Sequence, residues 1–452
     1  MRKMIAWLLV LTVVFSSVGC GKTTTNQSGD PSEKNGTGDK NNTNESVEAV
    51  KDKDDVTIDI LQYKVEIVEQ LDALIEDFEA VYPYIDVKID TVGGGQSYGD
   101  ALKARMNSGS EPDVFNIGGP VDLDLWFDFL EPLTNQPWIN HAYQGTLDMV
   151  TIDNEVYGQP YSIEGYGLMI NVDMFEQAGI DPSSVTSLSS LREVFSTLDS
   201  KKEELGIDTV LSFSIGGSAW WTAAIHAINL PFAHQEDPMA FVEGIYDGTQ
   251  TIAGNDRFVD FLNLLDLYFE YTYEDVMNVS YDDQVGNFAL EKTAVLHQGN
   301  WTIGMLNEIN PELNLAYLPI PLNDDPRGKN DTIPVGVPMY WTVNKNATDD
   351  KKEAAKLFLD YIASTERGAK FLVEDCSFIP PFSNVTLAAK DMLSAAIQDY
   401  SAAGKTVPWM WMYAPDGFTD PGVKETIQKY YVGELDKESI FPYLDEIWKS
   451  LE

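Results

Sequence analysis

The sequence alternates between strand and helix patterns from Val56 to Ile117. Apolar side chains at every second position predict strands over residues 56–61 and 85–89, and residues 113–117 are typical of a buried strand. Apolar residues at steps of three and four predict a helix over residues 67–78, and residues 100–107 also favour a helix. This β-α-β-α-β order indicates an α/β fold with a mainly parallel sheet and helices on both faces.

The loops after these strands are where we expect a ligand, because open α/β sheets bind ligands beyond the carboxyl ends of their strands. These loops begin at Gln62-Tyr63, Gly93-Gly94-Gly95 and Gly118-Gly119. The triple glycine lacks the Lys-Ser or Lys-Thr of a phosphate-binding loop, and no G-x-G-x-x-G opens a helix here. We therefore interpret it as a permissive turn.

The N-terminus has the layout of an export signal. A basic start precedes the apolar run from Ile5 to Phe15, which is too short to span a bilayer comfortably. Small residues and Cys20 follow, so the segment resembles a bacterial lipoprotein signal, in which the cysteine is lipidated and becomes the mature N-terminus. Ser17 stands where such signals usually carry leucine, and an ordinary secretory signal with an incidental cysteine is the alternative. We expect residues 1–19 to be the signal peptide.

Residues 20–55 are expected to form the lipidated cysteine and a disordered tether. They are rich in Gly, Ser, Thr, Asn, Lys and Asp, and too few of them are apolar to offset the entropy of an ordered chain. A flexible tether of this length reaches roughly 30 Å. Acylation of Cys20 would leave Cys376 as the remaining cysteine, so no intrachain disulfide is expected.

The composition favours a soluble body with a neutral ligand. The formal net charge is -42, which repels nucleic acid and anionic ligands but permits an uncharged ligand such as a sugar. Beyond residue 55 no apolar run is long enough to span a membrane, and at about 150 residues per domain we expect two or three domains.

Several stretches in a specific order resemble the family 1 extracellular solute-binding proteins, the sugar-binding subunits of bacterial ABC importers. Each stretch matches a family pattern of strands, glycines and aromatic residues, and together they cover essentially residues 56–452: Tyr157-Gly158-Gln159-Pro160-Tyr161, Leu168 to Ile180 with its Asn171 and Ala178-Gly179, Phe288 to Trp301 with Gly299-Asn300-Trp301, Leu318-Pro319-Ile320-Pro321, Gly336-Val337 and Glu353 to Leu359. The part from Val337 to Phe382 is most similar to members that handle raffinose-type and other multiple-sugar substrates.

The resemblance implies a type II periplasmic-binding-protein-like fold, with two α/β lobes joined by a hinge that the chain crosses several times. By analogy with maltodextrin-binding members, lobe 1 would hold residues 56–163 and 338–376, and lobe 2 residues 164–337 and 377–452. The implied function is capture of an oligosaccharide in the interlobe cleft and its delivery to the permease subunits of an ABC importer. The protein would be a monomer on the extracytoplasmic face of the cell membrane, held only by its lipid anchor.

Sugar sites pair aromatic rings, which stack on the apolar faces of pyranoses, with planar polar side chains that bond the hydroxyls. The resemblance places a stacking residue at Trp301 and others among Trp220, Trp221, Trp409 and Trp411. The polar and loop candidates complete a set of expected ligand-binding residues: Asn300, Glu164, Gln62, Tyr63 and Tyr340. Three other tryptophans are assigned to packing: Trp126, Trp138 and Trp448.

Two other functions use similar residues. A secreted glycoside hydrolase would add two carboxylates flanking the scissile bond, but no local signature singles out such a pair. A surface carbohydrate-binding protein without a transporter is the other alternative, although such modules are more often rich in strands. The histidines show no H-E-x-x-H or zinc spacing, and no G-x-S-x-G occurs. We therefore expect no enzyme activity, no cofactor and no metal.

Overall fold

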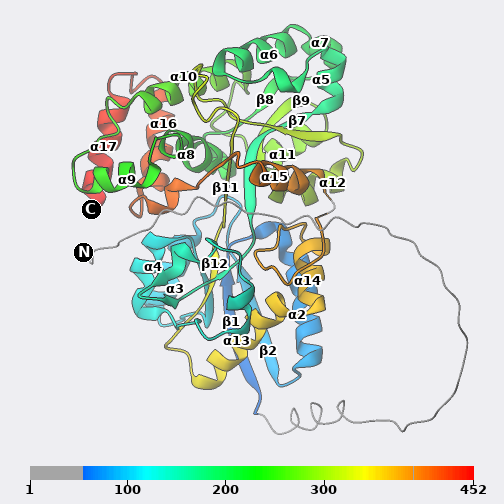
Figure 1. Ribbon diagram of the computed structural model, residues 1–452, viewed down its shortest axis with the longest axis vertical. Helices are drawn as coiled ribbons and strands as arrows, with labels where there is room; N and C mark the ends of the chain where they lie inside the picture. The colour runs from blue at the N-terminus through cyan, green and yellow to red at the C-terminus, as the bar shows by residue number, and fades with distance from the viewer. Residues whose placement is uncertain (1–53, 390) are drawn as a thin grey trace, which may run out of the picture.

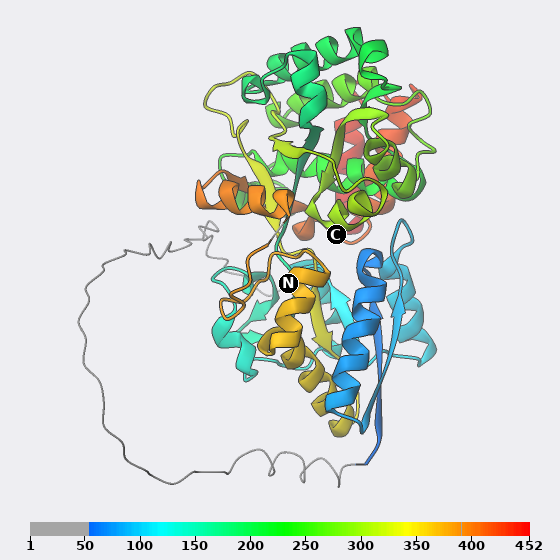
Figure 2. The same ribbon diagram turned by 90° about the vertical axis from the view of Figure 1, so that its right-hand side faces the viewer.

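The computed structural model describes residues 54–389 and 391–452, which form two α/β lobes stacked along the long axis of the molecule (Figures 1 and 2). The predicted signal peptide, Cys20 and the tether up to residue 53 lie outside the described residues. Within the part that is described, no helix is long and apolar enough to cross a membrane.

Lobe 1, the lower lobe in Figure 1, is built on a five-stranded sheet in the order β2-β1-β3-β12-β6. Its strands are β1 (Val56–Gln62), β2 (Ile85–Thr91), β3 (Val114–Ile117), β12 (Tyr340–Val343) and β6 (Gln159–Pro160). Its helices are α2 (Val68–Val81), α3 (Tyr98–Ser108), α4 (Pro120–Trp126), α13 (Asp349–Ser364) and α14 (Glu366–Lys370). A short hairpin of β4 (Thr151–Ile152) and β5 (Glu155–Val156) lies before β6.

The local sequence explains the first elements of lobe 1. Helix α2 buries Leu71, Leu74, Ile75 and Phe78 along one face, as expected for apolar residues at helical spacing. Helix α3 begins where the Ser97 side chain accepts a hydrogen bond from the backbone N–H of Asp100. These helices place the loops after β1 and β2 at the edge of lobe 1 that faces lobe 2 (Figure 2).

Lobe 2 contains a six-stranded sheet in which β7 is the central strand. Its strands are β7 (Glu164–Asn171), β8 (Thr209–Ser212), β9 (Thr293–Gly299), β10 (Leu315–Leu318), β11 (Ile333–Gly336) and β13 (Thr406–Val407). Its helices are α5 (Val172–Ala178), α6 (Leu188–Ser200), α7 (Lys202–Leu205), α8 (Ile228–Ala233), α9 (Pro238–Tyr246), α10 (Asp256–Tyr271), α11 (Tyr281–Ala289), α12 (Ile303–Ile309), α15 (Met392–Ala402), α16 (Lys424–Tyr431) and α17 (Ile440–Leu451).

The two-lobed α/β class predicted from the sequence is confirmed, but the sheets are mixed rather than mainly parallel. In lobe 1, β1 is parallel to β2 and β3, whereas β12 is antiparallel to both β3 and β6. In lobe 2, β7 is antiparallel to β9, β10 and β11. The reason is that strands entering a lobe from the other lobe, such as β7 and β12, run against their neighbours.

The chain passes between the lobes near Ile163, near Val337 and near Ile379, and the first and third passages are joined by a β-bridge between Ile163 and Ile379. Phe378, Phe382 and Val385, which the sequence assigned to lobe 2, lie in the hydrophobic core of lobe 1. The loop after Ile379 folds back onto lobe 1, where the Ser383 backbone N–H donates to the His141 carbonyl.

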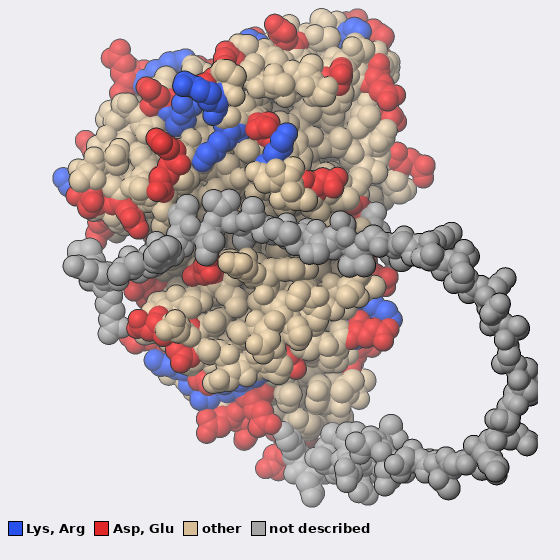
Figure 3. Space-filling model, viewed as in Figure 1, with Lys and Arg blue, Asp and Glu red and all other residues tan. Residues whose placement is uncertain are grey.

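The charged surface agrees with the composition. On the face shown in Figure 3, Asp and Glu are spread over both lobes, and Lys and Arg are interspersed among them on both. That described face has no continuous basic surface of the kind that nucleic acid binds.

Candidate functional site

The two lobes touch directly through polar side chains. The Tyr281 hydroxyl of lobe 2 donates to the Glu66 carboxylate of lobe 1 at 2.8 Å. Lys103 of lobe 1 forms an ion pair with Asp416 of lobe 2 at 2.5 Å. These contacts hold the segment after β1 and helix α3 against lobe 2.

An aromatic cluster of lobe 2 lies at this boundary, with three indole rings around His226. The centroid of the His226 ring lies 4.9 Å from Trp221, 5.2 Å from Trp301 and 5.9 Å from Trp411. Trp221 and Trp411 are half-buried, and Trp301 is 8% exposed. The cluster therefore combines three of the tryptophans that the sequence proposed for the site.

Trp301 is held by the end of strand β9. A Cβ atom on Gly299 would lie 2.0 Å from the Trp301 ring, so the ring lies directly over this glycine. The indole Nε1 donates to the Gln298 Oε1 at 3.1 Å. The Gly-x-Trp sequence is therefore a geometric requirement, because a side chain at Gly299 would displace the ring.

Lobe 1 contributes a buried charge beside Trp301. The Lys64 ammonium lies 2.8 Å from the Glu164 carboxylate, and both side chains are 3% exposed. The same ammonium lies 5.9 Å from the centroid of the Trp301 ring and 5.7 Å from that of Tyr63. Burial lowers the pKa of Lys64, but the charges of Glu164 and Glu66 outweigh it and raise that pKa overall. Lys64 is therefore a cation in this site.

Two residues near the boundary, the predicted Tyr63 and the unpredicted His226, have buried polar atoms without a hydrogen-bond partner. The hydroxyl of Tyr63 is buried without a hydrogen bond, and burial together with the Glu164 charge raises its pKa. The Nδ1 atom of His226 is likewise buried and unpaired. Burial, and the neighbouring His297, lower the pKa of His226 well below the usual value, so its imidazole is neutral near pH 7. Buried polar atoms normally have partners, which makes these two exceptions notable.

The polar candidates Gln62 and Asn300 serve the fold itself. The Gln62 side-chain amide donates to the Lys64 carbonyl and the Thr91 hydroxyl, and its oxygen accepts from the Lys64 N–H. Asn300 accepts from the Gly165 N–H at 3.1 Å and donates to Ser394. Both side chains are fully buried, so their hydrogen-bonding groups are engaged within the protein.

Three other aromatic candidates are not part of the cluster around His226: Trp409 packs against it, and Trp220 and Tyr340 lie apart from it. Trp409 is buried and stacks on Trp411 at 4.6 Å between ring centroids. Trp220 turns towards helix α16, where the Lys424 ammonium lies 5.0 Å from its ring centroid. Tyr340 is 1% exposed and packs in the core of lobe 1.

Sequence reasoning missed Lys64, Glu66, His226 and Tyr281. Lys64 and Glu66 belong to the loop after β1, whose position was predicted, but nothing local marks them as partners of lobe 2. The one local indication was the position of Lys64, which directly follows Gln62-Tyr63 beyond the carboxyl end of a strand, where ligands of α/β sheets bind.

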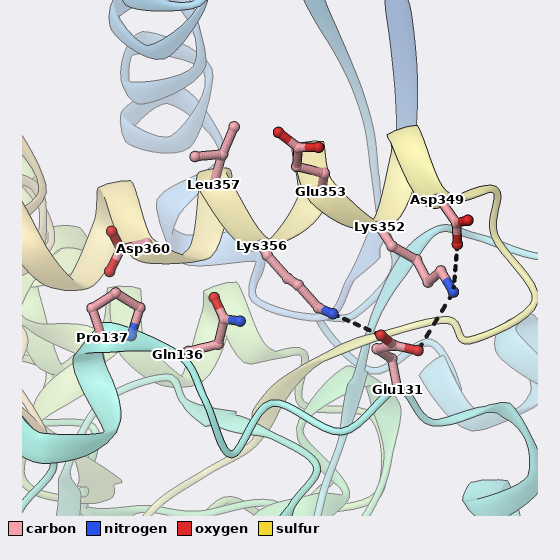
Figure 4. Close-up of a pocket in the computed structure, with 9 residues that line it drawn as sticks. All are labelled: Glu131, Gln136, Pro137, Asp349, Lys352, Glu353, Lys356, Leu357 and Asp360. Carbon is pink, nitrogen blue, oxygen red and sulfur yellow. Dashed lines mark hydrogen bonds and ion pairs between the residues drawn. The ribbon is translucent and has the colours of Figure 1, made fainter.

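A surface hollow of about 450 Å³ lies elsewhere, between α13 and the segment at residues 131–137 of lobe 1 (Figure 4). Glu131 crosses it to reach Lys356 at 2.6 Å and Lys352 at 3.7 Å. Its lining is charged and includes no aromatic ring, so it does not offer the stacking surface that a sugar needs.

Two α/β lobes joined by several passages, with an aromatic cluster at their boundary, define a two-lobed binding protein. The chain belongs to the bacterial extracellular solute-binding proteins: the family model matches residues 64–369. This match confirms the resemblance seen in the sequence motifs.

Relatives and solved structures agree with this assignment. The chain is 24% identical over 342 residues to a multiple sugar-binding protein of Streptococcus mutans, which covers 74% of this chain and 77% of the relative. It is 25% identical over 265 residues to a xylose/arabinose-binding protein of Haloferax volcanii, covering 55% of this chain and 54% of that protein.

The structure resembles those of the RafE solute-binding protein in complex with raffinose, with a TM-score of 0.71 and 20% identity, and of a chitin oligosaccharide binding protein, with a TM-score of 0.73 and 20% identity. Each comparison covers 88% of this chain and 99% of the other. At this identity the likeness establishes the fold.

Lobe contact also depends on Gly95. A Cβ atom there would lie 2.4 Å from the Cα of Ser218 in lobe 2, whereas a Cβ on Gly94 would meet nothing closer than 3.5 Å. Both glycines have positive φ angles, 61° at Gly94 and 94° at Gly95, so alanine strains the backbone at either position. We expect Gly95→Ala to open the lobes and raise the radius of gyration in small-angle X-ray scattering, with Gly94→Ala as the matched control. Equal radii for the two variants, each measured with bound sugar, would contradict the contact.

Proposed function

We propose that this chain is the substrate-binding subunit of a carbohydrate ABC importer, and that it captures an oligosaccharide between its two lobes. The observation that carries the proposal is the convergence of Trp221, Trp301 and Trp411 at the boundary with lobe 1. Indole faces in a largely desolvated site match the apolar faces of sugar rings. The sugar-binding relatives and the family membership support the same conclusion.

The proposed ligand contacts divide between the lobes. Trp301, Trp221 and Trp411 provide stacking surfaces from lobe 2. Tyr63, whose ring lies near the same Lys64 ammonium as Trp301, contributes from lobe 1. Glu164 and the unpaired Tyr63 hydroxyl supply hydrogen-bonding groups for sugar hydroxyls. Several indoles suit more than one sugar ring, so an oligosaccharide fits better than a monosaccharide.

In this proposal lobe closure is driven by the ligand. A sugar that contacts both lobes only in the closed form stabilises that form by its differential affinity. The permease subunits of the importer would then recognise the closed protein. We further propose that residues 1–19 direct export, that Cys20 is lipidated, and that a monomer is tethered on the extracytoplasmic side of the membrane.

A binding screen tests the proposal. We expect raffinose, stachyose, xylo-oligosaccharides or chitin oligosaccharides to raise the melting temperature of the purified chain in a scanning-fluorimetry panel, because a ligand that binds the native state stabilises it. Chromatography of the same samples should recover the sugar uncut. Cleaved products would instead favour a glycoside hydrolase, and the absence of any shift across neutral α- and β-linked oligosaccharides would contradict the proposal.

A further inference from the structure

Lys64 has charged or aromatic neighbours in both lobes. It belongs to the loop after β1 in lobe 1, while its ion-pair partner Glu164 is the first residue of β7 in lobe 2. Its ammonium also lies 5.4 Å from the ring of Phe378, beside the third chain passage, and 5.9 Å from the ring of Trp301. One charge thus touches both lobes and two of the passages between them.

Burial of the Lys64 charge is destabilising unless its ion-pair partner and the surrounding aromatic rings are all in place. Moving a charged amine out of water is strongly unfavourable, and only a close counter-ion and polarisable neighbours offset the lost hydration. Lys64 receives the first from Glu164 and the second from the faces of the surrounding aromatic rings. Glu66, two residues further on, accepts the hydroxyl of Tyr281 from lobe 2. The loop after β1 is therefore stabilised by partners that only the contacting lobes bring together.

We propose that Lys64 is a positioning residue of the binding site, which holds the Trp301 indole and the start of β7 in the geometry that the sugar requires. This inference rests on the proposed function, because the indole is the sugar platform. Lys64 acts through Trp301 and Glu164: it fixes the ring from lobe 1 and neutralises the carboxylate. Closure of the lobes therefore also brings the Trp301 indole into its sugar-binding position.

Lys64→Met is the main test, because methionine keeps an unbranched apolar side chain and removes the charge. Lys351→Met is the matched control: Lys351 forms an ion pair of 2.7 Å with the buried Asp113 entirely within lobe 1. Hydrogen exchange followed by mass spectrometry on the sugar-free proteins should show faster exchange in Lys64→Met at residues 163–166 and 299–303. Lys351→Met should leave both segments unchanged. A role confined to the stability of lobe 1 would not alter exchange in these lobe 2 segments.

Affinity provides the second readout, with the oligosaccharide that gives the largest melting shift as the probe. We expect Lys64→Met to raise its Kd at least about tenfold, and Glu164→Gln to add little more in the double variant, because neighbouring residues that act together are not additive. Unchanged exchange and unchanged Kd in Lys64→Met would overturn the inference while leaving sugar binding intact. If wild type binds none of the sugars, the proposed function fails, and the exchange measurement still decides the role of Lys64.

Discussion

Replacing Trp301 by alanine should weaken oligosaccharide binding by about 2–4 kcal/mol, or roughly 30- to 1,000-fold in Kd. The indole is almost fully buried at the lobe boundary, and Gly299 and Gln298 fix its position. A rigid aromatic ring in a desolvated site provides contact area at little entropic cost, and alanine removes it together with the face on which a sugar ring stacks. Isothermal titration calorimetry measures the change directly.

Trp448→Phe serves as the control for the Trp301 experiment. Trp448 is buried in the core of lobe 2 and packs on Phe232 and Phe418, away from the boundary cluster. We expect this variant to lower the melting temperature without changing the Kd for the sugar. A folded Trp301→Ala protein with the affinity of wild type would remove Trp301 from the site.

Acid should destabilise lobe 2 strongly through its buried histidines. Burial lowers the pKa of His226 well below its usual value and lowers the pKa of His234 and His297 to about 3. In the unfolded chain these groups titrate near a pKa of about 6.5. The unfolded state therefore binds more protons between these values, so the stabilisation is complete above pH 6.5 and is lost as the pH falls.

For His234 and His297 the expected loss is roughly 2.5 kcal/mol of unfolding free energy between pH 7 and pH 5.5, and the lowered pKa of His226 acts in the same direction. Carboxyl groups with raised pKa values oppose it, among them Asp122, whose pKa is raised by burial. The histidine contribution is isolated by His297→Phe, which suits a site surrounded by Tyr166, Phe213 and Tyr268.

Urea denaturation at several pH values measures the effect. His297→Phe should lose about 1.3 kcal/mol less than wild type over the same pH interval. Tyr268→Phe is the matched control, because it removes a buried unpaired hydroxyl from the same core without removing a group that titrates in this range. An identical pH dependence for wild type and His297→Phe would show that His297 does not resist protonation in the folded state.

The local elements of the fold and the parallel pairing of the first three strands were readable from the sequence, whereas the antiparallel pairing was not. The predicted strand at residues 56–61 is β1, and the predicted helix at 67–78 lies within η1 (Val65–Ile67) and α2. Apolar spacing determines both, since it reports which face is buried. The antiparallel partners of β3 and β7 come from residues more than a hundred positions away, and no local pattern encodes such pairing.

From the sequence, only the site residues that lie in family motifs could be predicted. Gly299-Asn300-Trp301 led to a ring that lies at the lobe boundary, beside Lys64. The assignment of Trp126, Trp138 and Trp448 to packing is confirmed, since all three are buried. Gln62 was expected to face a ligand because it follows a strand, but its amide closes the turn of its own loop. The partners of Lys64 and Tyr281 depend on how the lobes meet, which the sequence alone does not reveal.

A crystal structure of this chain with the oligosaccharide that most raises its melting temperature tests the central claim most directly. We expect a sugar between the lobes, with one ring stacked on Trp301 and another group of the ligand in contact with Tyr63 of lobe 1. An ordered sugar held by one lobe alone, for example in the charged hollow along α13, with none of the indoles in contact, would contradict it.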